Sequence, residues 1–131
     1  MDLAVAQVLA DAPASLPPLE MVMHGLAAIA AGPLAQWKSD IQARRATISR
    51  DSALRERELL KNAVLADVIA RALVGYPVEP KDAQLLAAYA VLIFDSALGE
   101  WLDSEHDIML VRVLKRTQER LRSLTALPSQ L

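Results

Sequence analysis

Cysteine is absent from this chain, and aromatic residues make up only 4% of it. Without cysteine there is no disulfide framework, no thiolate nucleophile and no zinc site built on cysteine. Because 53% of the residues are hydrophobic and so few are aromatic, the core must consist mainly of alanine, leucine, valine and isoleucine. Alanine and leucine lead the helix-propensity scale, so the composition favours an all-α protein. The length of 131 residues fits a single domain covering 1–131.

A large excess of either charge is missing as well, since 14 basic residues stand against 16 acidic ones. The net charge of −2 gives no overall attraction to nucleic acid or to an anionic membrane. The longest apolar run, 85–94, has about half the length of a membrane-spanning helix. The first residues, Met1-Asp2-Leu3, lack the basic region of a signal peptide. We therefore expect a cytoplasmic protein that binds no membrane and no nucleic acid by itself.

Proline, glycine and aspartate divide the sequence into about six expected helices. Proline is tolerated in the first helical turn, and aspartate is a favourable N-cap residue. For the last helix, Ser104 and Asp107 form an imperfect capping box. The expected helices begin near Asp2, Pro17, Leu34, Asp51, Pro80 and Ser104.

The last two expected helices carry more apolar surface than the other expected helices can bury. The run 85–94 has no polar face, so its helix must be covered all round. The final helix repeats apolar residues every three or four positions and needs a partner too. A second copy would meet both needs by forming a four-helix bundle from the last two helices of each subunit. The alternative is a compact monomer in which other helices wrap the fifth. The expected interface residues are Ala88, Val91, Leu92, Asp95, Leu110, Val111, Leu114 and Leu121.

Six segments of the sequence resemble segments of one known family of domains. They are 9–13, 17–20, 44–48, 51–60, 78–80 and 94–103, the last of which includes Trp101-Leu102. Together they resemble the C-terminal domain of TetR-family transcription regulators. The resemblance implies an all-helical domain that binds an effector and forms a homodimer. In that family a helix-turn-helix domain precedes this one and reads DNA. No such domain stands in this sequence, so DNA contact is implied only through a domain absent from the chain.

The resemblance also implies a pocket between the middle helices for a small apolar or amphipathic effector. In it, His24 would offer a hydrogen bond, although a partly exposed histidine without a ligand is the alternative. Each of the other lining residues could equally belong to an ordinary core. The expected ligand-binding residues are Met23, His24, Trp37, Ile41, Val64, Val68, Tyr89 and Phe94.

Catalytic motifs are missing from the sequence. It contains no His-Glu-x-x-His motif and no glycine-rich phosphate loop, and its serines have no recognisable partner base. His106 lies in the acidic turn 103–107, where acidic residues at a helix N-terminus explain the pattern better than a metal does. We therefore expect no enzyme, no cofactor and no metal site.

These observations lead to two hypotheses. The first is the ligand-binding and homodimerisation domain of a TetR-like regulator, which senses a small apolar or amphipathic effector. The alternative is a helical interaction or adaptor module whose apolar stripe binds a different chain without a small-molecule ligand. A small helical enzyme would need a buried ionisable cluster, which the sequence does not display.

Overall fold

The computed structural model describes residues 17–32, 38–74, 76–104 and 108–126. Within these ranges the regular structure is entirely helical, which confirms the expected all-α class. Five helices lie in the described part, and the further helix expected near residues 2–11 lies outside it. The helices are α2 (Pro18–Ala31), α3 (Lys38–Ser49), α4 (Ser52–Ala72), α5 (Pro80–Asp103) and α6 (Leu110–Thr125).

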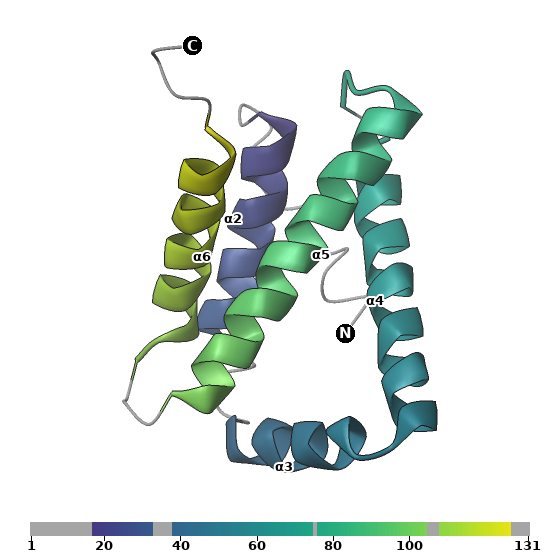
Figure 1. Cartoon of the computed structure of the whole chain (residues 1–131). Helices are drawn as coiled ribbons and strands as arrows, with labels where there is room; N and C mark the ends of the chain where they lie inside the picture. Colours follow the sequence, from purple (N-terminus) through teal and green to yellow (C-terminus); the bar gives the residue numbers. More distant parts are fainter. Residues whose placement is uncertain (1–16, 33–37, 75, 105–107, 127–131) are drawn as a thin grey trace.

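Helix α5 is the centre of the fold, and it packs against α2, α4 and α6 (Figure 1). It runs antiparallel to α4 and to α6, while α3 lies across the end of the bundle where α5 finishes (Figure 1). The arrangement follows from composition, because α5 holds the apolar run that the sequence provides. Every other described helix therefore contacts α5 on some part of its surface.

Three helix starts lie where local chemistry places them. Proline stands in the first turn of both α2 and α5, as expected. The carboxylate of Asp51 caps α4, since its Oδ1 accepts hydrogen bonds from the amides of Ala53 at 2.9 Å and Leu54 at 3.3 Å. The expected start of α6 at Ser104 is wrong: Ser104 is the C-cap of α5, and α6 begins at Leu110.

The core among the described residues is apolar throughout, with no fully buried polar or charged residue. Its side chains come from α2, α4, α5 and α6, and alanines of α5 let the neighbouring helices approach. The indole Nε1 of Trp101 donates to the carbonyl of Ile108 at 2.9 Å, which ties the end of α5 to the segment before α6. The largest completely buried side chains are Met21, Leu26, Ile69, Leu73, Ile93, Leu110 and Leu114.

Helix α3 is attached differently, because none of its residues is buried. Its side chains bind the carbonyl end of α5: the Gln42 amide donates to the Leu102 carbonyl at 2.7 Å, and the Lys38 amine donates to the Ser104 carbonyl at 3.4 Å. The same amine lies 5.0 Å from the ring centroid of Trp101, within cation–π range. A cation at this end also complements the negative end of the α5 dipole.

A third α3 contact lies about two turns earlier along α5. The Arg45 guanidinium comes within 3.9 Å of the Asp95 carboxylate. A Cβ added at Gly99 would lie 3.1 Å from Nη2 of Arg45, so glycine leaves the room that the arginine occupies. These polar contacts hold α3 on α5 together with the half-buried Ile41, which packs against the core.

A single copy of the chain does not cover α5 all round. Leu85 is 69% exposed and Leu92 is 57% exposed. By length and composition alone α5 could cross a membrane, but 44% of its apolar window is buried inside the bundle. The core helix of a packed bundle passes the same test, so this finding is weak evidence for a membrane span.

Candidate functional site

The residues expected to line an effector pocket are spread over four helices and lie in different environments. Met23 on α2 and Phe94 on α5 are buried in the apolar core. His24 and Val64 are exposed on α2 and α4. The structure therefore does not bring these four side chains together around one enclosed space. Of the others, Ile41, Val68 and Tyr89 are half-buried, and Trp37 lies outside the described residues.

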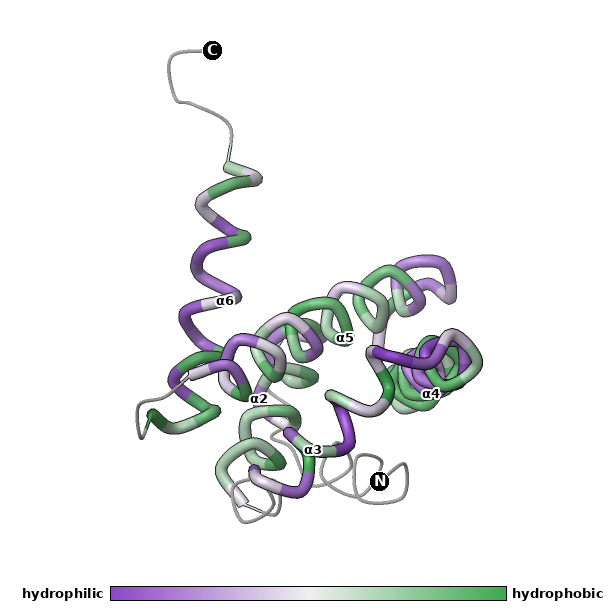
Figure 2. Tube along the Cα trace, turned by 60° about the horizontal axis from the view of Figure 1, so that its bottom comes forward, coloured by the Kyte–Doolittle hydropathy of each residue, from purple (hydrophilic) through white to green (hydrophobic). Residues whose placement is uncertain are grey.

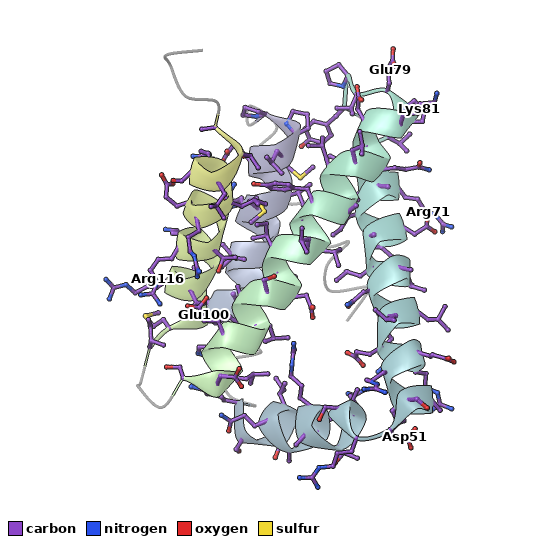
Figure 3. The ribbon with its side chains drawn as sticks, in the orientation of Figure 1. Asp51, Arg71, Glu79, Lys81, Glu100 and Arg116 are labelled. Atoms are coloured by element: carbon purple, nitrogen blue, oxygen red, sulfur yellow. The ribbon has the colours of Figure 1, made fainter. Side chains whose placement is uncertain are left out.

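Two adjoining surface hollows lie along α5 and α6, with volumes of about 470 and 430 Å³. Both are open to solvent, and Glu100 and Arg116 line both; Figure 3 shows these two residues on the same side of the helix pair. Glu100 also lies 4.0 Å from Arg120. The lining is mostly charged or polar, unlike the apolar pockets that bind small hydrophobic ligands.

The residues expected at a dimer interface divide between core and surface. Leu110 and Leu114 are only 2% and 1% exposed, so α6 already buries these leucines inside its own chain. Val91 is buried as well. A side chain that is already buried in one copy gains little further burial from a second copy, so these three residues would add little to an interface. Ala88 and Leu92 are exposed, while Asp95, Val111 and Leu121 are half-buried.

The exposed members of this set, Ala88 and Leu92, share one face of α5 with the exposed Lys81 and Leu85 and the half-buried Asp95. We call these five residues the α5 outer face. Their spacings of four, three, four and three residues place them on one side of a helix. In Figure 2 the middle of α5 is coloured hydrophobic, whereas α6 carries long hydrophilic stretches. Leu85 was not among the expected interface residues, although its spacing from Ala88 and Leu92 carries the signal.

The described residues hold no group of three or more histidine, aspartate or glutamate side chains placed to bind a metal ion. His106 and its neighbours 105–107 lie outside the described residues. Apolar side chains are also exposed on α4, at Leu59, Leu60 and Val64. The α5 outer face is one candidate site in the described part of the chain. Its chemistry is that of a contact surface: two leucines and an alanine between one basic and one acidic residue.

No protein-family model and no curated protein matches this chain.

Proposed function

We propose that this chain is a self-associating helical domain that acts by binding and forms a homodimer. The observation that carries the proposal is the α5 outer face, where Leu85 and Leu92 are left largely in water. Most apolar side chains of α5 are buried in the core, whereas these two leucines lie in one row on its solvent-exposed side and would gain burial from a second chain.

Free-energy magnitudes indicate a dimer of moderate strength. Complete burial of a leucine stabilises by about 1.5–3 kcal/mol, so the four leucines of a two-fold pair contribute at most about 6–12 kcal/mol. Association costs about 4–15 kcal/mol in lost translational and rotational freedom. Because the two ranges overlap, the dimer must depend on additional contacts around the leucines, and it should dissociate on dilution.

Within this proposal, the role suggested by the sequence is the regulatory domain of a TetR-like transcription regulator in the cytoplasm. A small apolar or amphipathic effector would bind there, and DNA would be read by a separate domain. The all-helical fold and the antiparallel α5 and α6 support this role. The effector would have to favour one arrangement of the two subunits over another in order to regulate anything.

An adaptor without a small-molecule ligand is the second candidate. The observation that favours it is the position of His24 and Val64, which face solvent instead of a shared pocket with Met23 and Phe94. Thermal shift with a panel of small amphipathic compounds separates the two candidates. A bound effector raises the unfolding temperature, because a ligand that binds only the folded state stabilises it by RT ln(1 + L/Kd), where L is its free concentration. No shift across the panel would favour the adaptor.

Self-association is tested by replacing the exposed leucines. We expect the double variant Leu85→Gln/Leu92→Gln to remain monomeric at concentrations where the unchanged protein is a dimer. Leu60→Gln is the matched control, because Leu60 is 66% exposed on the side of α4 opposite the buried Ile69. Light scattering coupled to gel filtration gives both masses. An unchanged dimer in the double variant would refute the proposed surface.

A further inference from the structure

We propose that two copies of this chain pair through their α5 outer faces in antiparallel register, with Leu85 of one copy beside Leu92 of the other. The proposal rests on the self-association argued above and adds its surface and its orientation. It is argued from burial, from the charge at each end of the face and from symmetry.

The pattern of burial favours α5 over α6 as the helix that forms the interface. The apolar side of α6 packs against its own chain, where Leu110 and Leu114 are buried. The basic side chains Arg112, Lys115 and Arg116 are exposed on α6. Pairing two copies of that basic surface about a two-fold axis would place like charges close together, which is unfavourable. The α5 outer face has no such repulsion at its centre, because Leu85, Ala88 and Leu92 are uncharged.

Charge selects the antiparallel orientation. Lys81 lies near the start of α5 (Figure 3). Asp95 lies two heptads later, about 21 Å along the helix axis at 1.5 Å per residue. A parallel pair would place lysine beside lysine and aspartate beside aspartate. An antiparallel pair centred near Ala88 places each Lys81 beside the Asp95 of the other copy. The Asp95 carboxylate is available for this, since its side chain is 48% exposed beside Arg45.

Symmetry selects a second copy as the occupant. The face is self-complementary: Lys81 lies at one end of an apolar centre, and the Asp95 carboxylate lies at the other end, 3.9 Å from the Arg45 guanidinium, so a two-fold rotation brings each lysine to a carboxylate. The small side chain of Ala88 lies at the crossing point, where it lets the two backbones approach closely. Leu85 and Leu92 then flank the crossing on both sides.

The complete lack of cysteine makes disulfide cross-linking a clean test, because an introduced cysteine has no native thiol to pair with. Ala88→Cys should form a disulfide-linked dimer under mild oxidation, since a disulfide needs Cα atoms about 4.4–6.8 Å apart. Leu60→Cys is the control on α4, where Leu60 is also exposed and lies outside the α5 outer face. Cross-linking of Ala88→Cys no faster than Leu60→Cys would overturn the proposal.

Orientation is tested with a mixture. Leu85→Cys and Leu92→Cys, one of them isotopically labelled, should cross-link to each other faster than either links to itself. Self-linking of Leu85→Cys at the rate of the mixture would overturn the antiparallel register. Lys81→Glu should raise the dissociation constant about 2- to 30-fold, because two exposed ion pairs are lost and replaced by repulsion. An unchanged dissociation constant would count against the charge argument.

These outcomes are distinguishable from failure of the proposed function. A protein that is dimeric in solution but does not cross-link at Ala88 associates through another surface. In that case self-association stands and the register fails. If the protein is monomeric at every concentration, both the proposed self-association and the antiparallel register are refuted.

Discussion

Asp51 shows how much one side chain contributes to the position of a helix. It accepts two backbone hydrogen bonds at the start of α4, from amides that have no partner within the helix. We expect Asp51→Ala to lower the free energy of unfolding by about 0.5–2 kcal/mol, measured by urea denaturation. Asp51→Asn keeps the accepting oxygen and should lose much less. Equal losses in both variants would show that charge, rather than capping, stabilises this end.

Leu114 and Leu60 are chemically identical residues with opposite roles. Leu114 is buried within its own chain, so Leu114→Ala should lower the free energy of unfolding by about 2–5 kcal/mol. The exposed Leu60→Ala should change it by no more than about 0.5 kcal/mol. The loss at Leu114 should be the same at every protein concentration. A loss that disappears on dilution would place Leu114 at a subunit interface instead.

Among the helices, α3 should be the least protected. It buries no residue fully, and it is held by the polar contacts of Lys38, Gln42 and Arg45 and by the half-buried Ile41. Helices with few buried contacts open locally at low free-energy cost, so the amides of α3 should exchange with deuterium faster than those of α5. Hydrogen-exchange mass spectrometry measures both in one experiment. Protection of α3 equal to that of α5 would contradict this account of its attachment.

Helix starts could be predicted where the signal is local. Proline in the first turn and the aspartate cap act within a few residues, so the starts of α2, α4 and α5 follow from the sequence. The start of α6 could not be predicted in this way. Ser104 and Asp107 imitate a capping box, but Ser104 closes α5, and its carbonyl accepts from Lys38 of α3. That contact joins residues 66 positions apart in the sequence, which no local pattern reveals.

At the scale of the molecule, the sequence predicts the all-α class and the apolar α5 but not which side of α5 stays open. Periodicity defines a helical face, whereas its cover depends on how the other helices pack. The same limit applies to the candidate site. The apolar residues Val91, Leu92, Leu110 and Leu114 were all expected at one interface, yet packing within the chain buries Val91, Leu110 and Leu114 and leaves Leu92 exposed. The expected pocket residues divide between core and solvent for the same reason.

The most direct test of the central claim is the mass of the unchanged protein in solution, measured by light scattering across a dilution series at micromolar concentrations. The account predicts a mass near twice 14.3 kDa at the highest concentration, falling toward 14.3 kDa on dilution. A mass that stays at 14.3 kDa throughout would contradict self-association through the α5 outer face.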